Sequence, residues 1–429
     1  MRSKRVAIDR NLRPVMGNQC EESGVVIVGA GEAGGGLTGM LRQHGYTGKI
    51  TLIGDELYPP YRRPPLSKGF LAGEVTLESL YLKSAEGYAR HQIDCRYGIG
   101  VESIDRDART VRLFDSTTIP FRHLVIATGG RARRLSLPGA NHSNVHYVRT
   151  IDDILKLKEQ FLPGKRLLII GGGYIGLEAA SVGIKKGLKV TLVEALPRML
   201  ARVTVPELSA FYERAHKARG VEIFTGVGVH SLDGDPLVTE VVLSDSRRLA
   251  VDLLIVGIGL IPNTELAEAC GLEVQNGVVV DAFNRTSDPG VYAIGDCSNQ
   301  DNTFLQRRVR LESVPNAAEQ MRVCAASICG KPMPNNSVPW FWSDQYDLKL
   351  QMVGLSQDSD QLAIRGNLDR ESFCAFHLRG GVIIAADAVN RAADFMVAKK
   401  LVAERIRASV EQLGDESFPL KSLLPVKGA

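Results

Sequence analysis

Two segments of this chain share one pattern: an apolar strand, a tight glycine turn, a helix and a second apolar strand. The first segment covers residues 24–55 and contains the turn GAGEAG, and the second covers residues 165–194 and contains GGGYIG. A strand, a glycine turn and an amphipathic helix that lead into a parallel strand form a βαβ unit. The sequence therefore predicts an α/β fold with two Rossmann-like dinucleotide-binding domains.

Glycines in both turns have the G-x-G-x-x-G spacing of dinucleotide-binding proteins. The first two glycines let the backbone turn sharply and approach a pyrophosphate, and the third lets helix and strand pack closely. The N-terminus of the helix adds amide donors and a positive dipole. We expect dinucleotide contacts from Gly29, Gly31, Ala33 and Gly34 in the first turn and from Gly171, Gly173, Tyr174, Ile175 and Gly176 in the second.

An acidic residue at the end of the second strand of such a unit binds the adenine ribose. In the second segment this residue is Glu194. A carboxylate there accepts hydrogen bonds from the ribose hydroxyls and repels a 2′-phosphate, so it predicts a preference for NADH. A solvated glutamate without a ligand is the alternative. The first segment has Gly54 in this place, so the ribose partner is expected to be Asp55 or Glu56.

Three later stretches assign the two nucleotides. Residues 286–296 read as an apolar strand that ends in Gly-Asp, and in flavoproteins with two dinucleotide folds such a late aspartate, here Asp296, holds the ribityl chain of FAD. Residues 124–130 (LVIATGG) resemble the strand of those flavoproteins that crosses to the nucleotide domain, and DLLIVGIGLIPNTEL resembles the return crossing. FAD is therefore expected at the first turn and NAD at the second.

These signals divide the chain into three folded parts. We predict an FAD-binding domain from residues 24–132 and 259–334, an NAD-binding domain from residues 133–258, and a C-terminal α+β interface domain from residues 335–429. The C-terminal domain follows the linker-like stretch KPMPNNSVP and is expected to contain alternating strands and a helix over about residues 392–412. Residues 1–23 are basic and polar and are expected to form a disordered extension.

Composition argues against several classes of function. The net charge of +4 is too small to indicate nucleic-acid binding by itself, and no apolar run approaches the roughly 18 residues of a membrane span. The N-terminal residues lack the apolar stretch of a secretory signal. The seven scattered cysteines favour a reducing compartment, and the eight histidines show no metal-ligand spacing. A cytoplasmic enzyme without a bound metal is expected.

Longer stretches carry a more specific resemblance. They are PPLSK (64–68), SLYL (79–82), IATGGR (126–131), GGGYIGLE (171–178), VTVPELSAFYE (203–213), GIGLIPN (257–263), RLESVPNAAEQ (310–320) and PWFWSDQY (339–346). From about Gly24 to the C-terminus the chain resembles the FAD-containing ferredoxin reductases of bacterial oxygenase systems. The resemblance implies an oxidoreductase that passes hydride from NADH to FAD and then single electrons to a [2Fe–2S] ferredoxin, which supplies a cytochrome P450 or another oxygenase.

The same resemblance implies roles for individual residues. Lys68 would lie beside the flavin ring and pair with Glu178, and these two would be the catalytic residues. Val314 would direct the amides of a helix N-terminus toward the flavin, where negative charge develops on reduction, and Trp342 would pack near the ring. Alone, Lys68 would read as an exposed loop lysine and Trp342 as a core aromatic. The other FAD contacts would be Arg63, Val101, Thr128, Gly129, Arg149 and Asp296, and NAD would also contact Glu178 and Gly259.

The positions of the cysteines indicate whether this chain could be a disulfide reductase with the same fold. Those enzymes carry a reactive cysteine just after the first βαβ unit, and residues 57–73 contain none. Cys324 and Cys329 fall in an apparent helix and would point about 140° apart, so we expect buried helix residues and no disulfide chemistry. A rubredoxin reductase, an NADH oxidase and a partner-binding flavoprotein like apoptosis-inducing factor remain as alternatives.

Basic residues near the inferred flavin elements suggest how an acceptor docks. A ferredoxin that carries one electron must bind and leave twice per NADH, which favours a transient interface steered by charge. Such ferredoxins are acidic, and the reductase is expected to be a monomer or a weak dimer. Candidate docking residues are Arg307, Arg308 and Arg310, with Arg131, Arg133 and Arg134 as a second group. Solvated arginines or partners of the FAD phosphates are the alternative.

Overall fold

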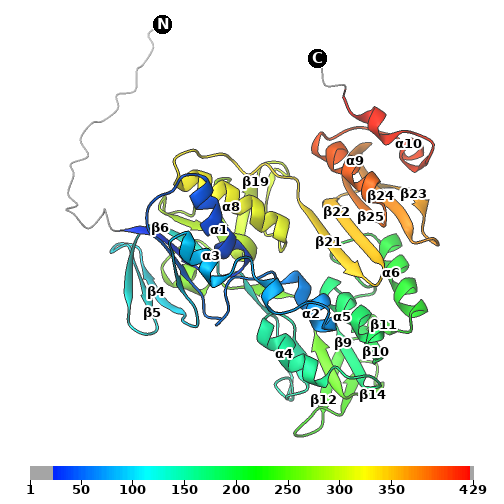
Figure 1. The fold of residues 1–429 in the computed structure, drawn as a ribbon. Helices are drawn as coiled ribbons and strands as arrows, with labels where there is room; N and C mark the ends of the chain where they lie inside the picture. Colours follow the sequence, from blue (N-terminus) through cyan, green and yellow to red (C-terminus); the bar gives the residue numbers. More distant parts are fainter. Residues whose placement is uncertain (1–22, 426–429) are drawn as a thin grey trace.

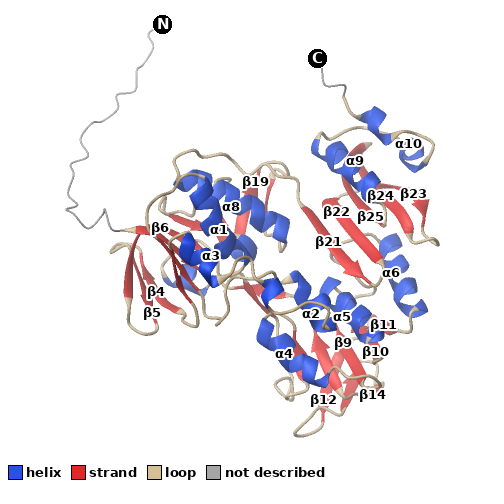
Figure 2. Cartoon of the chain, viewed as in Figure 1, coloured by secondary structure: helices blue, strands red, loops and turns tan. Residues whose placement is uncertain are grey.

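The structure is a computed structural model that describes residues 23–425. Its three main sheets are a mixed sheet and a parallel sheet, both packed with helices, and an antiparallel sheet (Figures 1 and 2). The predicted extension over residues 1–23 lies almost entirely outside this range. Within the described range, no helix is both long enough and apolar enough to cross a membrane. The predicted class, α/β with two Rossmann-like domains and an α+β C-terminal domain, is confirmed.

The first sheet is formed by both ends of the segment assigned to FAD. Its parallel strands have the order β3-β2-β1-β6, and β18 pairs with β6 in parallel although it follows more than 160 residues later. Helices α1 and α8 pack against each other on this sheet (Figure 1). The bounds are β1 Gly24–Val28, α1 Glu32–Gln43, β2 Ile50–Ile53, β3 Ile93–Arg96, β4 Val101–Asp105, β5 Thr110–Leu113, β6 Thr118–Ile126, β18 Val291–Ala293 and α8 Val314–Ile328.

The second sheet lies within the segment assigned to NAD. Its five strands are all parallel, with the order β11-β10-β9-β15-β8, and a three-stranded antiparallel sheet, β12-β13-β14, lies beside it. The bounds are β8 Val145–Tyr147, α4 Ile151–Gln160, β9 Arg166–Ile170, α5 Tyr174–Lys185, β10 Lys189–Glu194, α6 Pro206–Ala218, β11 Glu222–Thr225, β12 Val229–Asp233, β13 Glu240–Leu243, β14 Arg248–Ala250 and β15 Leu253–Val256.

Two short strands connect these parts of the chain. Strand β7 (Gly130–Ala132) leaves the first sheet, and β16 (Leu260–Pro262) returns to it, and the two pair antiparallel. Thr128 and Asn263 fasten the crossing, because the Thr128 hydroxyl donates to the Asn263 carbonyl at 2.7 Å and the Asn263 amide donates to the Thr128 carbonyl at 3.0 Å. The predicted crossing and return strands are thus present and lie side by side.

The C-terminal part is an antiparallel sheet with helices on one side. Its strand order is β21-β22-β25-β24-β23. The predicted single helix over residues 392–412 is wrong beyond Ala403: α9 ends there, Arg405 has a positive φ of 50°, and Arg407 forms a β-bridge with Val382 before Ser409 caps α10. The bounds are β21 Trp340–Gln345, β22 Leu348–Gly354, β23 Gln361–Asn367, β24 Ser372–Arg379, β25 Val382–Val389, α9 Ala392–Ala403 and α10 Val410–Gly414.

One apolar core joins all three parts around the site described below. It contains Leu66 and Phe70 from the first part, Leu177 from α5, and Leu348 and Phe373 from the C-terminal sheet, and all five are at most 3% exposed. The remaining short elements are η1 Pro64–Ser67, α2 Gly69–Ala72, η2 Glu78–Leu80, α3 Ala85–Arg90, α7 Glu265–Ala269, β17 Val278–Val280, η3 Gly295–Cys297, β19 Ser298–Asn302, β20 Arg307–Val309 and η4 Leu420–Leu423.

Candidate functional site

The first glycine turn has the geometry that a bound pyrophosphate requires. Gly29 has a φ of +112°, and a Cβ there would lie 2.2 Å from the Ala127 carbonyl oxygen. A Cβ on Gly34 would lie 1.9 Å from the Gly29 carbonyl oxygen, so only glycine lets α1 pack this closely on β1. A Cβ on Gly31 would meet nothing within 4 Å, and no side chain caps the helix that begins after it. The turn therefore leaves open space beside uncapped helix amides.

The second turn repeats this geometry. Gly171 has a φ of +111°, and a Cβ on Gly176 would lie 2.1 Å from the Gly171 carbonyl oxygen. Gly173 faces open space, and α5 begins after it without a side-chain cap. Of the neighbouring predicted contacts, Tyr174 is packed against Phe341 with ring centroids 4.9 Å apart, whereas Ile175 is 45% exposed. Ile175 is the more accessible of these two side chains to a ligand.

The strand-end carboxylates differ between the two turns. Glu194 accepts hydrogen bonds from the backbone amides of Gly172, at 2.7 Å, and Leu196, at 2.8 Å, so its carboxylate is held beside the open glycine turn. Glu56 is instead bound by Tyr61 and Arg63 at 2.6 and 2.7 Å, and Asp55 is exposed. A side chain at Gly54 would meet the Ala30 side chain at 2.5 Å, which explains the missing acid there.

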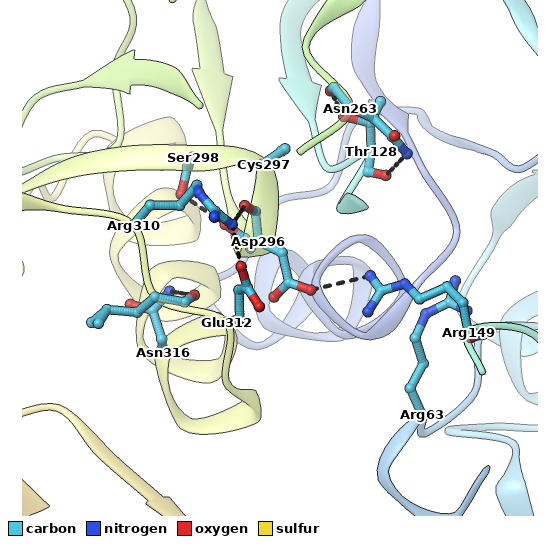
Figure 3. Close-up of polar contacts among 12 residues, drawn as sticks. Arg63, Thr128, Arg149, Asn263, Asp296, Cys297, Ser298, Arg310, Glu312 and Asn316 are labelled. Carbon is cyan, nitrogen blue, oxygen red and sulfur yellow. Dashed lines mark hydrogen bonds and ion pairs between the residues drawn. The ribbon is translucent and has the colours of Figure 1, made fainter. Parts of the chain in front are cut away.

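Residues from distant parts of the chain meet at the edge of the first sheet (Figure 3). Strands β1, β6 and β18 are parallel and in register at Val28, Ile126 and Ala293, so the residues that follow them share one edge. There Arg149 donates to the Asp296 carboxylate at 3.1 Å. A Cβ on Gly129 would lie 3.3 Å from the Arg149 guanidinium.

Arg63 contacts this group through the backbone of Arg149. Its guanidinium donates to the Arg149 carbonyl oxygen at 2.6 Å. Burial lowers the pKa of Arg149, and the nearby Arg63 charge acts in the same direction. The Nε atom of Arg149 is buried without a hydrogen-bond partner. A guanidinium with a free donor beside an uncapped helix N-terminus is suited to an anionic or hydroxyl-rich ligand.

Lys68 and Glu178 form the predicted pair. Their side chains are 19% and 4% exposed, and the Lys68 ammonium lies 2.7 Å from Glu178 Oε2. The Glu178 carboxylate also accepts hydrogen bonds from Ser67 and Ser343, each at 2.6 Å. Sequence reasoning did not select these serines. Because η1, α5 and β21 each contribute one side, Glu178 lies where the three parts of the chain meet.

The other predicted flavin residues are placed as follows. Val314 is the first residue of α8, whose N-cap Ser313 accepts a hydrogen bond from the Asn316 amide at 3.2 Å. Trp342 lies on β21, partly exposed, with its ring centroid 5.6 Å from that of Trp340. Val101 is 9% exposed and packs in the core of the first part. Gly259 has a φ of +118° at the return crossing.

Glu32 is a further candidate that sequence reasoning missed. It lies in the first turn of α1, directly after Gly31, and its Oε2 atom is buried without a hydrogen-bond partner. Burial raises the pKa of this carboxyl, and Arg62 and Arg63 oppose that shift. An acidic residue between the second and third glycines of the turn was the available signal.

The predicted docking arginines differ in accessibility. Arg307 is exposed and lies 3.3 Å from the Asp358 carboxylate, and Arg308 is exposed but donates to the carbonyl oxygens of Val280 and Asn299 at 2.8 and 2.7 Å. The Arg310 side chain is only 12% exposed and binds the Glu312 carboxylate and the Asp296 carbonyl oxygen (Figure 3). Arg310 is thus internal to the site, which argues against a direct role in docking.

The cysteines of the described range are all free. Cys324 is fully buried in α8, and burial raises the pKa of its thiol. Cys329 lies at the C-terminal cap of α8 and is partly buried, so it is not within the helix as predicted. No cluster of His, Cys, Asp or Glu among the described residues could hold a metal.

These features fit two dinucleotides. Each turn has a glycine that faces open space and a helix N-terminus without a side-chain cap. Each also has acidic or guanidinium groups at the same sheet edge.

Residues 23–320 match the family model described as pyridine nucleotide-disulphide oxidoreductase, and residues 340–424 match the model described as reductase C-terminal. The chain belongs to the pyridine nucleotide-disulphide oxidoreductase family. As a member of it, the chain is an oxidoreductase that uses FAD and NAD(H).

Individual relatives of this family cover nearly the whole chain. Putidaredoxin reductase CamA of Pseudomonas putida is 45% identical over 93% of this chain and 96% of its own length. Rhodocoxin reductase of Rhodococcus erythropolis is 42% identical over 92% of this chain and 93% of its own. The reductase in the covalent putidaredoxin reductase–putidaredoxin complex matches the structure with a TM-score of 0.91, at 44% identity, over 94% of this chain and 98% of that chain.

Proposed function

We propose that this oxidoreductase takes hydride from NADH onto FAD and passes single electrons to an acidic [2Fe–2S] ferredoxin, which supplies a cytochrome P450 or another oxygenase. The observation that carries the proposal is the Lys68–Glu178 pair, 2.7 Å apart and buried where η1, helix α5 and strand β21 of the C-terminal sheet meet. When bound, FAD accepts two electrons as hydride and releases them one at a time. The likeness to reductases named for ferredoxins supports the choice of acceptor.

The two glycine turns would bind different nucleotides. The amides after Gly31, together with Arg149 and Asp296, would hold FAD, and the amides after Gly173 would hold NADH. Glu194 would select NADH because its carboxylate, already oriented by the Gly172 and Leu196 amides, repels a 2′-phosphate.

Lys68 and Glu178 would fix the approach of nicotinamide to flavin. Hydride transfer requires the reacting atoms to lie within roughly 3–3.5 Å. A lysine held on one side by a buried carboxylate and on the other by a proline-rich 3-10 helix has little freedom to move. We therefore propose that this pair orients the nicotinamide relative to the flavin and does not exchange protons with either.

Docking of the ferredoxin would depend on exposed positive charge. Arg307 and Arg308 are exposed on β20, whereas Arg310 is internal. We therefore restrict the docking role to the first two and assign Arg310 to the support of Asp296. We also propose that the enzyme works in the cytoplasm, because its described cysteines are free, as expected in a reducing compartment. We further propose that it is a monomer or a weak dimer.

Acceptor assays test this function. The purified holoenzyme should oxidise NADH slowly in air and rapidly when a [2Fe–2S] ferredoxin is added. A rubredoxin in place of the ferredoxin, and oxygen alone, serve as the competing acceptors. Rapid turnover with rubredoxin or oxygen but not with any [2Fe–2S] ferredoxin would replace the proposed acceptor, and absence of NADH oxidation with every acceptor, including ferricyanide, would favour a partner-binding role.

A further inference from the structure

A chain of hydrogen bonds leads from the Lys68–Glu178 pair into the protein interior. Ser343 donates to Glu178 Oε1 at 2.6 Å, and Gln345 donates to the Ser343 hydroxyl at 3.2 Å. The side-chain amide oxygen of Gln345, Oε1, lies 2.8 Å from His216 Nε2, and His216 Nδ1 lies 3.2 Å from the Tyr346 hydroxyl. The chain thus connects β21 with α5 and α6.

Its inner members are almost completely removed from solvent. Ser343 and His216 are 0% exposed, Gln345 is 1% exposed and Glu178 is 3% exposed. Buried polar groups in such a network have no water to replace a lost partner, so each is held by its neighbours. The backbone is fixed as well, because the amide of Tyr346 donates to the Ser181 hydroxyl of α5 at 2.6 Å.

The direction of every hydrogen bond follows from the carboxylate at the end. Glu178 can only accept, so Ser343 must donate to it and accept from the Gln345 amide nitrogen. The Gln345 oxygen then faces His216 and requires a proton on Nε2. Burial lowers the pKa of His216 to about 4, so the ring is neutral and its Nδ1 accepts from Tyr346. All these donors point toward Glu178.

We propose that Ser343, Gln345 and His216 are positioning residues, which orient the Glu178 carboxylate and through it the Lys68 ammonium. Hydrogen bonds aligned in one direction polarise one another and strengthen the last bond, here the one to Glu178. Outer partners of this kind orient functional groups that they do not touch directly. The proposal rests on the proposed function, in which Lys68 lies beside the flavin.

Gln345→Leu interrupts the chain at its centre while it leaves the volume nearly unchanged. In the otherwise unaltered holoenzyme it should slow stopped-flow flavin reduction by NADH on the order of tenfold, the size typical for the loss of an outer partner. In a Lys68→Met background the same change should have little further effect, because its route of action is already removed. The flavin midpoint potential should follow the same pattern, shifted by Gln345→Leu alone and unchanged by it when Lys68 is absent.

Four further variants separate positioning from general damage. Gln361→Leu removes an exposed glutamine from β23 of the same sheet and should leave rate and potential unchanged. His216→Gln keeps a donor toward Gln345 and should retain more of the rate than His216→Leu. If Gln345→Leu does not fold, Ser343→Ala provides the same test with a smaller change.

The outcomes distinguish the two levels of the argument. If Lys68→Met slows flavin reduction but Gln345→Leu has no effect, or slows it equally in both backgrounds, the chain does not position Lys68 and this inference fails alone. If Lys68→Met leaves the rate unchanged, the role proposed for Lys68 fails and the inference fails with it.

Discussion

Replacing Lys68 with methionine should destabilise the protein far more than replacing a surface lysine. The change removes the ammonium 2.7 Å from Glu178 and leaves a carboxylate that is 4% exposed. At an effective dielectric constant of about 20, two charges at that distance attract by about 6 kcal/mol, and breaking a buried pair costs about 3–5 kcal/mol in practice. Because Ser67 and Ser343 still donate to the carboxylate, we expect the lower end, a loss of about 3 kcal/mol in the free energy of unfolding.

A second substitution identifies the origin of this loss. In Lys68→Met/Glu178→Gln no charge remains buried. One serine hydroxyl can still donate to the amide oxygen, and the other can turn to accept from the amide nitrogen. We expect the double variant to recover roughly half of the loss, since pairs in contact are not additive. The matched control is Lys185→Met. It removes a lysine from α5, the helix that carries Glu178, where Lys185 pairs with Glu74 at side-chain exposures of 66% and 50%.

Urea unfolding of the holoenzyme, followed by circular dichroism and flavin fluorescence, measures these differences. Lys185→Met should cost less than about 1 kcal/mol, as expected for an exposed pair. Stopped-flow reduction by NADH should be slowed in Lys68→Met and normal in Lys185→Met. Equal stabilities for the two single variants would refute the reasoning that removing Lys68 leaves a buried carboxylate without its counter-charge.

Three further predictions concern cofactor choice, cysteines and docking. Glu194→Gln should raise kcat/KM for NADPH relative to NADH, because it removes the charge that opposes a 2′-phosphate, and an unchanged ratio would exclude this role. Replacing each of the seven cysteines by serine or alanine should leave acceptor reduction largely intact in every variant that folds, and a large loss at one position would contradict it. Arg307→Glu should raise KM for ferredoxin and weaken the salt dependence of that KM without affecting ferricyanide reduction. Arg310→Glu should lower the reduction of both ferredoxin and ferricyanide. Equal losses from Arg307→Glu with the two acceptors would exclude Arg307 from docking.

The glycine turns could be predicted from sequence because their requirements are local. A positive φ at Gly29 and a close helix–strand approach at Gly34 each exclude a side chain, so the spacing alone reports the geometry. The flanking apolar runs indicated the strands in the same way, and β1 and β9 begin at Gly24 and Arg166, within one residue of the starts of the two predicted segments. Local patterns of this kind are the part of a fold that a single sequence carries most clearly.

The surroundings of Glu178 could not be predicted in this way. Its partners Ser67 and Ser343 lie 111 and 165 residues away in sequence. Both serines fall in stretches that carry the family resemblance, PPLSK and PWFWSDQY, but nothing local marks them as partners of Glu178. The pairing with Lys68 was expected from the family resemblance, and the structure places the two side chains 2.7 Å apart. The contact between His216 and Gln345 was not expected, because these residues lie 129 positions apart in the sequence.

Tertiary contacts also overrode two local expectations. The helical pattern beyond Ala403 gives way because the chain turns at Arg405 and pairs with Val382 through Arg407. Arg310 reads as one of three surface arginines, yet hydrogen bonds to Glu312 and to the Asp296 carbonyl oxygen keep it inside. In both cases one deciding partner, Val382 for Arg407 and Asp296 for Arg310, lies outside the local sequence window.

The stoichiometry of electron delivery tests the central claim most directly. The holoenzyme, kept free of oxygen, is mixed with a limiting amount of NADH and an excess of oxidised [2Fe–2S] ferredoxin, and both absorbance changes are followed together. We predict that each NADH consumed reduces two ferredoxin molecules and that the flavin ends oxidised. Reduced flavin that persists in the presence of oxidised ferredoxin, with no change in the ferredoxin spectrum, would contradict the assignment of this protein as a ferredoxin reductase.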